Sequence, residues 1–392
     1  MKPNKHIVVV AGEESGDQHA ATFVTALKQT HPTLRFSGIG GQHMQDAGVE
    51  LISDLARYGV TGLVEILRHA KIIRQAFVCI KAHLQQQPPD LLILVDYPGF
   101  NLRLAKFAKE VLNIRVLYYI SPQIWAWKAH RIHTIQRYVD KMAVILPFEK
   151  SLYAQAGVPV AFVGHPLVEK LHITEPVSTV KSKLGIPTNK RILAMLPGSR
   201  YNEIKYLLPI LQQTAKKVLQ AYPNVHIVMP IARSLKREDI TALFDTSNLP
   251  LTLVDQQAIP ALYVSDFVIV ASGTASLEAA LLTKPMCIIY KASLLTYIVA
   301  FRVMRIKYLG LCNILQNKMI VPELLQDDCS VEELTKVMLD LMRDPEKSGR
   351  MIKRLQQLKH SLASQQADIS MPNLIMEELQ AAQLSSSNGP SL

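Results

Sequence analysis

Residues 267–278, FVIVASGTASLE, indicate the fold of this chain more clearly than any other stretch. Four apolar residues have the length of a buried strand, and Ser, Gly and Thr then lead into a helical pattern of Ala, Leu and Glu. The free backbone N–H groups at the start of such a helix attract an anion, and a glycine there lets phosphate oxygens come close. Ser272, Gly273 and Thr274 are therefore candidates for phosphate binding, with Glu278 one turn further on for a sugar hydroxyl. The alternative is that these small residues only pack.

The composition is that of a large globular protein. Its 392 residues exceed the size at which one hydrophobic core usually keeps growing, so we expect two domains. Hydrophobic residues make up 49% and charged residues 19%, which excludes disordered and fibrous classes. The four cysteines form no Cys-x-x-Cys pair, which fits buried thiols in a reducing compartment.

Targeting and charge patterns favour a cytoplasmic protein with an anionic partner. Residues 1–6 lead directly into a short apolar run, too short for a signal peptide, and no segment has the ~18 apolar residues of a membrane span. Lys and Arg exceed Asp and Glu by 43 to 32, a net charge of +11. Nucleic acid, a nucleotide or an acidic membrane surface would each suit this charge.

Two series of apolar runs predict two doubly wound α/β domains. Most runs are apolar throughout, which is typical of parallel strands covered on both faces. The first series comprises residues 7–11, 34–38, 91–96, 116–120, 142–146 and 160–163, and the second comprises 192–196, 225–229, 251–254, 267–270 and 286–290. Ligands bind at the carboxyl ends of such strands, so we expect a cleft between the domains. Helical patterns cover 331–342 and 346–384, and residues 385–392 have the composition of a disordered tail.

Two loops of the first half carry acidic residues after apolar strands. Glu13 and Asp17 stand in the first strand–helix turn, where acidic side chains and the absence of Gly-x-Gly-x-x-Gly argue against a dinucleotide and favour sugar hydroxyls. Helix capping by Ser15 and Asp17 is the alternative. Asp96, in the loop that continues to Asn101, follows a very apolar strand, so poor solvation predicts a raised pKa and the role of a base. An ordinary Pro-Gly turn is the alternative there.

Aromatic and basic residues mark two further turns. Residues 121–127 contain both tryptophans, Trp125 and Trp127, which either stack on a sugar or pack in the domain interior. In the second half, Gly198, Ser199 and Arg200 end a strand and precede a helix. Among these residues Arg200 is the best single candidate for binding a diphosphate, because a guanidinium forms paired hydrogen bonds to phosphate and stays charged. The alternative is a surface arginine near a helix start.

The sequence gives no sign of a metal or a resident cofactor. His130 and His133 share a helical spacing but have no further ligand set beside them. The chain contains neither Asp-x-Asp nor the P-loop pattern. We therefore expect no metal site and no cofactor.

Two basic amphipathic segments have the pattern of helices that lie on membranes. Residues 59–84 place apolar side chains at helical spacing among arginines and lysines, and 291–307 repeat this pattern. The candidate membrane- or acyl-binding residues of the first segment are Leu63, Ile66, Leu67, Ile73, Phe77 and Ile80. The alternative is that both helices pack on their sheets.

Read together, these motifs resemble the lipid-A-disaccharide synthase family of bacterial glycosyltransferases. The matching positions follow the family order over nearly the whole chain: 11–17, 96 with 98 and 100–101, 121–122 with 125–127, 146–149, 164–165, 196–200, 271–274 with 278, and 313 with 321–326. Gly99 stands where many relatives carry a second acidic residue, and Cys312 replaces a proline. A carboxylate pair in the loop of Asp96 is therefore not expected.

The resemblance implies a fold and a reaction. The fold would be GT-B, with Rossmann-like domains at 1–170 and 171–345, and with helices at 346–384 that return to the first domain. The enzyme would transfer 2,3-diacylglucosamine from its UDP derivative to 2,3-diacylglucosamine 1-phosphate, with inversion and without a metal, and release UDP. It would bind the anionic inner membrane peripherally from the cytoplasmic side, with no nucleic acid partner, and could be a homodimer.

The resemblance also assigns site residues. The UDP site would comprise Gly198, Ser199, Arg200, Ser272, Gly273, Thr274, Glu278 and Asn313. Asp96 would be the base, with Glu13 beside it and with Asp17 and Asn101 on the acceptor side. Two rival hypotheses are a UDP-N-acetylglucosamine 2-epimerase and a non-catalytic nucleotide-sugar-binding membrane adaptor.

Overall fold

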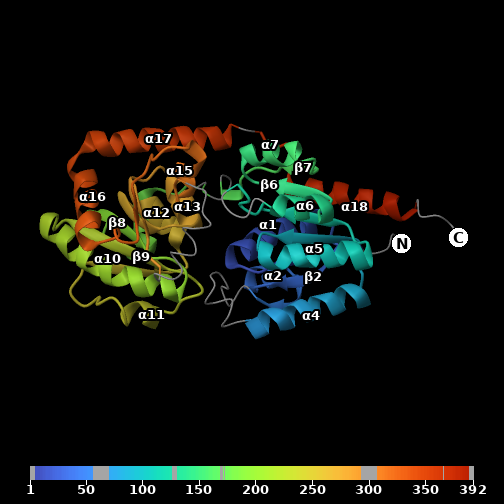
Figure 1. The fold of residues 1–392 in the computed structure, drawn as a ribbon. Helices are drawn as coiled ribbons and strands as arrows, with labels where there is room; N and C mark the ends of the chain where they lie inside the picture. Colours follow the sequence, from blue (N-terminus) through green and yellow to red (C-terminus); the bar gives the residue numbers. More distant parts are fainter. Residues whose placement is uncertain are drawn as a thin grey trace. The chain divides into compact units, whose positions relative to one another are not determined.

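The chain folds into two compact units (Figure 1). The first unit combines Met1–Pro166 with Gln365–Leu392, and the second consists of Leu167–Ser364. The computed structural model describes residues 5–55, 70–125, 130–167, 171, 173–292, 307–364 and 366–387. No helix among these residues has both the length and the apolar character needed to cross a bilayer.

A parallel sheet forms the centre of the first unit. Its described strands are β1 (His6–Ala11), β2 (Arg35–Gly40), β3 (Glu50–Asp54), β4 (Leu91–Val95), β5 (Val116–Tyr119), β6 (Lys141–Val144) and β7 (Val160–Phe162). They lie in the order β3-β2-β1-β4-β5-β6-β7. The chain moves outward on one side from β1 and on the other from β4, so the topological switch point lies between these two strands.

Helices cover both faces of this sheet. They are α1 (Glu14–Thr30), α2 (Gln42–Asp46), α4 (Ala70–Gln86), α5 (Pro98–Leu112), α6 (Arg131–Tyr138), α7 (Pro147–Gln155) and α18 (Met371–Ser387). Alternate residues of β1 point to opposite faces. Val8 and Val10 enter a core shared with α4 to α7, whereas Ile7 and Val9 enter a core shared with α1, α2 and α18.

Helix α18 brings the end of the chain back to the first unit. Met371, Leu374, Ile375 and Leu379 are buried against α1 and the sheet. The carboxylate of Glu378 is also buried and accepts a hydrogen bond of 2.6 Å from Nε of Arg115. The C-terminal helix therefore completes one of the two cores of this unit.

The second unit repeats the same architecture. Its described strands are β8 (Arg191–Leu196), β9 (Val225–Ile231), β10 (Leu251–Asp255), β11 (Phe267–Ala271), β12 (Met286–Tyr290) and β13 (Glu323–Leu325), in the parallel order β10-β9-β8-β11-β12-β13. The helices are α9 (Val177–Lys183), α10 (Tyr201–Ala221), α11 (Arg237–Thr241), α12 (Ala258–Val264), α13 (Thr274–Leu281), α15 (Leu311–Gln316), α16 (Val331–Arg343) and α17 (Pro345–Ala363). Here the switch point lies between β8 and β11.

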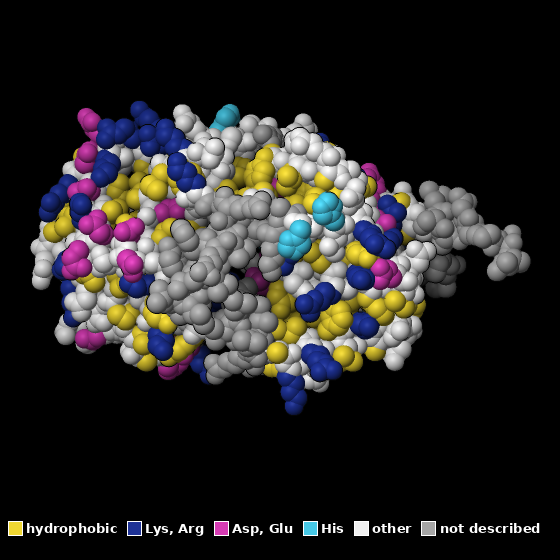
Figure 2. Space-filling model, in the orientation of Figure 1, with side chains coloured by type: hydrophobic (Ala, Val, Ile, Leu, Met, Phe, Trp, Pro, Cys, Tyr) yellow, Lys and Arg dark blue, Asp and Glu magenta, His cyan; other side chains and the backbone are white. Residues whose placement is uncertain are grey.

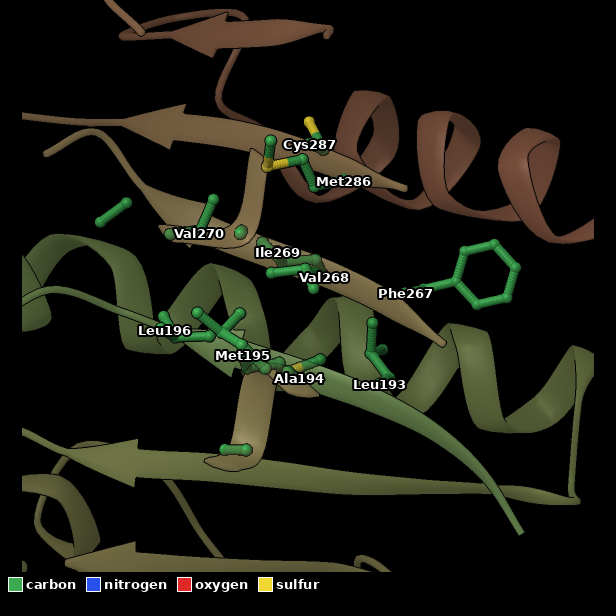
Figure 3. Close-up of a cluster of buried hydrophobic side chains, with 14 of the residues drawn as sticks. Leu193, Ala194, Met195, Leu196, Phe267, Val268, Ile269, Val270, Met286 and Cys287 are labelled. Carbon is green, nitrogen blue, oxygen red and sulfur yellow. The ribbon is translucent and has the colours of Figure 1, made fainter. Parts of the chain in front are cut away.

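The core of the second unit explains why these strands are apolar throughout. Figure 3 shows side chains from β8, β11 and β12 packed into one cluster, including Leu193, Ile269 and Cys287. Helix α17, the first part of the segment 346–384, buries Met351, Leu355, Leu358 and Leu362 in this same cluster. The predicted architecture of two doubly wound α/β sheets is confirmed.

Candidate functional site

The polar loops predicted from the sequence follow the strands that flank the two switch points. In the first unit, Glu13 follows β1 and Asp96 follows β4. In the second unit, Arg200 follows β8 and Gly273 follows β11. The carboxyl ends of neighbouring parallel strands at a switch point form the usual ligand crevice of such sheets. Each unit therefore carries one candidate site at the expected edge.

The loop of Asp96 has an unusual backbone. Asp96 and Tyr97 are consecutive non-glycine residues in the left-handed region, each with φ +46°. Such residues persist only where the surrounding structure holds them. The carbonyl oxygen of Asp96 accepts hydrogen bonds from the Tyr118 hydroxyl at 2.6 Å and from Nδ2 of Asn101 at 2.7 Å. These two donors hold the strained turn from which the Asp96 side chain extends.

The environment of Asp96 gives it the basicity expected of a proton acceptor. Burial raises the pKa of its carboxyl to about 6, while a hydrogen bond from the backbone of Tyr97 and the charge of Arg131 oppose that rise. The carboxyl is therefore ionised at neutral pH, and it is a stronger base than a solvated aspartate.

The loop of Asp96 also touches the first strand–helix turn. The ring of Tyr97 lies against Gly12, where an added Cβ would approach the ring carbon Cδ1 to 2.2 Å. Burial and the charge of Glu13 raise the pKa of Tyr97 to about 12. Gly12 is therefore required by close packing, and Tyr97 brings the loops of Glu13 and Asp96 together.

Asp17 and Asn101 make hydrogen bonds to the backbone of neighbouring loops. Both carboxylate oxygens of the buried Asp17 accept backbone N–H groups at the start of α2: from Gly41 at 2.7 Å, His43 at 3.0 Å and Met44 at 3.1 Å. Asn101 is fully buried and directs Nδ2 at the carbonyls of Val10, Val95 and Asp96. Each residue thus supports the backbone of the loops, and a role of either on the acceptor side stays a prediction.

Sequence reasoning included Glu149 only in the matching stretch 146–149 and gave it no role in the site. Glu149, at the start of α7, is 1% exposed, and Oε1 accepts a hydrogen bond of 3.2 Å from the Trp125 indole. Burial raises its pKa to about 7, and the charge of Asp96 contributes to the rise. Its position directly after strand β6 was the available signal. Trp127 lies outside the described residues.

His165 belongs to the matching positions 164–165, but the sequence reasoning gave it no role in the site. It is buried, and burial together with the nearby His19 lowers the pKa of His165 to about 4. The imidazole is therefore neutral at physiological pH.

Arg200 lies at the start of α10 and is held by its own helix. Nη1 bonds Oε1 of Glu203 at 2.6 Å, and Oε2 of Glu203 accepts the backbone N–H of Ser199 at 3.2 Å. The Arg200 side chain remains 39% exposed. Gly198 lies against Glu203, and the Ser234 hydroxyl donates to the carbonyl of Ser199 at 2.5 Å. A fixed and partly exposed guanidinium is suited to bind a phosphate.

The turn at Gly273 leaves space for a ligand. Gly273 is exposed, has φ +155° and has no atom within 4 Å of where a Cβ would lie. Thr274 begins α13, and the first N–H groups of a helix have no partner within it. The Ser272 hydroxyl makes a long contact of 3.5 Å with the Leu309 carbonyl, and Glu278 is half-buried on the first turns of α13. This turn retains the features of an anion site.

Asn313 holds the loop that follows α15. It is fully buried, and its Nδ2 donates to the Val321 carbonyl at 2.7 Å and to Oε1 of Glu323 at 2.6 Å. Its Oδ1 accepts the N–H groups of Ile320 and Val321. The polar groups of its side chain are thus used within the chain, and a contact between Asn313 and UDP stays a prediction.

Helix α4 packs on the sheet with most of its apolar residues. Ile80 is fully buried, and Ile73 and Phe77 pack against the same core. The ring of Phe77 meets Phe100 edge-on at 5.1 Å, and Phe100 stacks with Tyr97 at 5.8 Å. The prediction of a membrane-facing side chain is wrong for Ile80, and Ile73 and Phe77 serve mainly the core. Leu63, Ile66, Leu67 and the segment 293–306 lie outside the described residues.

No metal cluster is present in the described part of the chain. None of its His, Cys, Asp and Glu side chains form a group of three or more that could hold an ion. Cys287, Cys312 and Cys329 are buried free thiols, and Cys79 is exposed.

Comparison with known proteins identifies the family. The model of the lipid-A-disaccharide synthetase family matches residues 7–379. The chain belongs to this family. Lipid-A-disaccharide synthase 1 of Legionella pneumophila is 55% identical over 96% of this chain and 98% of its own. Lipid-A-disaccharide synthase of Geobacter sulfurreducens is 40% identical over 95% of this chain and 97% of its own.

Solved structures with similar folds support the GT-B architecture of this family member. The UDP-GlcNAc 2-epimerase of Neisseria meningitidis bound to UDP-GlcNAc has a TM-score of 0.59 at 15% identity, covering 92% of this chain and 100% of that one. The calicheamicin glycosyltransferase CalG4 has a TM-score of 0.56 at 16% identity and covers both chains fully. At such identities the likeness concerns the fold alone. The GT-B prediction is confirmed, and the epimerase similarity does not extend to function.

Proposed function

We propose that this enzyme forms the lipid A disaccharide by transferring 2,3-diacylglucosamine from its UDP derivative to 2,3-diacylglucosamine 1-phosphate. The second unit binds UDP through Arg200, Ser199, Gly198 and the turn Ser272–Thr274, with Glu278 at the ribose. The first unit binds the acceptor at the loops of Glu13 and Asp96. The observation that carries the proposal is Asp96: a basic carboxylate held on a strained turn at the switch point of a family member.

The reaction is one displacement at the anomeric carbon. The acceptor 6-hydroxyl loses its proton to the Asp96 carboxylate while its oxygen forms the new C–O bond. The bond from the anomeric carbon to the UDP oxygen breaks on the opposite face, so an α-linked donor gives a β-1,6-linked product and UDP. Negative charge grows on the diphosphate as that bond breaks. Arg200 and the N-terminus of α13 stabilise this charge more in the transition state than in the ground state.

Peripheral binding to the cytoplasmic face of the inner membrane belongs to the same proposal. Diacylated substrates reside in a bilayer, and the outer face of α4 exposes Lys71 and Arg74 together with Val78, which is 59% exposed. Figure 2 shows Lys and Arg side chains beside hydrophobic ones over the area where Figure 1 draws α4. Such a face attracts anionic headgroups. Assembly into a homodimer stays a prediction, which sedimentation of the purified protein would test.

Product formation with both substrates tests the function directly. The purified enzyme is mixed in detergent with UDP-2,3-diacylglucosamine, with and without the acceptor 1-phosphate, and UDP and lipid products are quantified. We expect one UDP for each disaccharide, and no UDP without acceptor. UDP release without acceptor, or conversion of UDP-N-acetylglucosamine at its 2-position, would contradict the proposal.

A further inference from the structure

We propose that Glu149 is a positioning residue of the acceptor site, held on Trp125, Ser121 and the backbone of Leu146 so that its charge acts on Asp96. This inference rests on the proposed function, in which Asp96 is the base. Glu149 is distinct from the residues of that mechanism, because it lies on α7 and follows β6, whereas Asp96 follows β4.

Sheet topology places the two acids at one edge. Strands β4, β5 and β6 are parallel neighbours, so Asp96, Ser121 and Glu149 all follow carboxyl ends on the same side of the sheet. Two strand spacings separate the first acid from the last, about 10 Å, which is within reach of electrostatic coupling in a dry interior. Burial is the main cause of the raised pKa of Glu149, and the charge of Asp96 adds a smaller contribution in the same direction.

The hydrogen bonds of Glu149 leave it able to titrate. Oε1 accepts the Trp125 indole N–H at 3.2 Å, and Oε2 accepts the Leu146 N–H over a long 3.4 Å. The Ser121 hydroxyl interacts with the carboxyl and lies 2.8 Å from the Tyr153 hydroxyl. No Lys or Arg ion pair neutralises Glu149 among the described residues. A carboxyl that is 1% exposed and has only neutral donors is costly to ionise, and burial raises its pKa to about 7.

The other described titratable groups around Glu149 and Asp96 are neutral tyrosines or cations paired elsewhere or facing Asp96. Tyr118 on β5 has its pKa raised by burial and stays neutral, as does Tyr153 on α7. Arg131 at the start of α6 is the cation that acts on Asp96. Lys150, the residue after Glu149, donates a hydrogen bond of 2.6 Å from Nζ to Oδ1 of Asp368 and therefore does not pair with Glu149. In this proposal, ionisation of Glu149 increases the proton affinity of Asp96, whereas a neutral Glu149 leaves Asp96 a weaker base.

The variant Glu149→Gln keeps the shape and the acceptor for Trp125 but removes the charge. In the unmodified enzyme we expect kcat/KM to rise with pH in two steps, because the pKa of Asp96 is raised to about 6 and that of Glu149 to about 7. We expect E149Q to rise in one step, to reach a lower kcat plateau, and to keep the KM for the UDP-sugar. A wild-type pH profile in folded E149Q would overturn the proposal.

A second variant keeps the carboxyl of Glu149 but should raise its pKa. Trp125→Phe removes the indole donor, so ionised Glu149 loses a hydrogen bond and the upper step moves to higher pH. Lys150→Met serves as the control, because it changes a charge one residue away that points to Asp368, and its profile should match that of the wild type. An unchanged upper step in W125F would also contradict the proposal.

A measurement without turnover separates this inference from the proposed base. The neutral-carboxyl band of Glu149, assigned by its loss in E149Q, is titrated by infrared spectroscopy in wild type and in Asp96→Asn. Removing the charge of Asp96 should move the midpoint of Glu149 to lower pH by roughly one unit. The same midpoint in both proteins would overturn the coupling. Retained turnover in D96N would instead refute only the assignment of Asp96 as base.

Discussion

Asp96 illustrates how one residue couples activity to stability. Its carboxyl is shifted from a pKa of 3.8 to about 6, so the native protein binds more protons than the unfolded chain between these values. Stability associated with this group is therefore present at low pH and is lost as the pH rises through about 6. Above that pH the ionised carboxylate destabilises the fold by up to about 3 kcal/mol, at about 1.4 kcal/mol per unit of pKa shift.

We expect Asp96→Asn to abolish most turnover while stabilising the protein at pH 8. Asparagine removes the buried charge and can still accept the backbone hydrogen bond of Tyr97. The free energy of unfolding, measured in denaturant at pH 8 and pH 4, should exceed that of the wild type only at pH 8. Equal stabilisation at both pH values would show that desolvation of a charge is not the cause.

Asn101 is predicted to matter through its amide donor. Asn101→Asp would place a carboxylate against the carbonyls of Val10, Val95 and Asp96, the last only 2.7 Å away. We expect a loss of about 3 kcal/mol or more of unfolding free energy, because a buried charge would face three acceptors. The exposed Asn373→Asp in the same unit is the control. Partial recovery at pH 5, where the new acid is protonated, should be visible in the same denaturation experiment.

Arg200 is predicted to bind the diphosphate through its planar fork. Arg200→Ala should lower kcat/KM for the UDP-sugar by about 10²–10³, and Arg200→Lys should recover only part of it, because lysine lacks the paired donors. Arg237→Ala, which breaks a surface pair with Asp255 in the same unit, should leave the kinetics unchanged. Steady-state kinetics at varied UDP-sugar concentration measure kcat/KM for each variant. A wild-type kcat/KM in R200A would show that Arg200 does not bind the diphosphate.

At this scale the sequence located the loops better than the side-chain directions. Asp96 and Arg200 follow apolar strands, and the polar groups of such loops gather at the carboxyl edge of the sheet. Asp17 and Asn313 stand in equally suggestive positions, yet the structure turns both toward backbone N–H groups. The side-chain oxygens of an Asp or Asn in such a loop can accept hydrogen bonds either from a ligand or from the backbone of a neighbouring loop. The sequence does not distinguish these two uses. Glu149 was given no role in the site because its neighbours Trp125 and Ser121 are distant in the chain.

Among the elements, α4 combines two roles on opposite faces. Ile80 and Leu84 are buried in the core, while Lys71, Arg74 and Val78 face outward. The apolar periodicity that suggested a membrane surface thus reports mainly the sheet-facing side. The basic outer face remains available for anionic headgroups.

We expect Lys71→Gln combined with Arg74→Gln to weaken binding to anionic vesicles about thirtyfold, at about 1 kcal/mol for each removed charge. Cosedimentation with phosphatidylglycerol vesicles at low salt measures the loss, and turnover of detergent-dispersed substrates should stay normal. Lys336→Gln with Lys353→Gln, on α16 and α17 of the second unit, provides the charge-matched control. An equal loss in the control would show that net charge, rather than the α4 face, governs binding.

The sequence predicted the central strands and the edge strands β7 and β10, and it missed the edge strands β3 and β13. Strands such as β4 and β11 are apolar throughout, because helices cover both of their faces. Strands β3 and β13 lie at the edges of their sheets; β3 is half-exposed and polar, and β13 has only three residues. Neither has a run long or apolar enough to stand out from a loop.

For the whole molecule, the first unit depends on a distant part of the chain. Helix α18 contributes four large apolar side chains and the Arg115–Glu378 ion pair to a unit that otherwise ends at Pro166. Burial of each such side chain contributes about 1.5–3 kcal/mol, so the helix supplies a large share of a domain's net stability.

Leu374→Ala is predicted to destabilise the first unit alone, by about 2–5 kcal/mol. Hydrogen exchange followed by mass spectrometry should show faster exchange in peptides of β1 and β4, and unchanged exchange in peptides of β8 and β11. The exposed Glu377→Ala on the same helix is the control. Faster exchange in both units would contradict the independence of the two cores.

The route of the chain out of the first unit and back has a consequence during protein synthesis. The ribosome delivers Leu167–Ser364 in full before the last helix exists, so the second unit can complete its core while the first still lacks one of its covering layers. Until α18 emerges, the face formed by Ile7, Val9 and Ile93 has no cover from it, which is the kind of surface that chaperones bind. The amino-terminal half is thus made first and finished last.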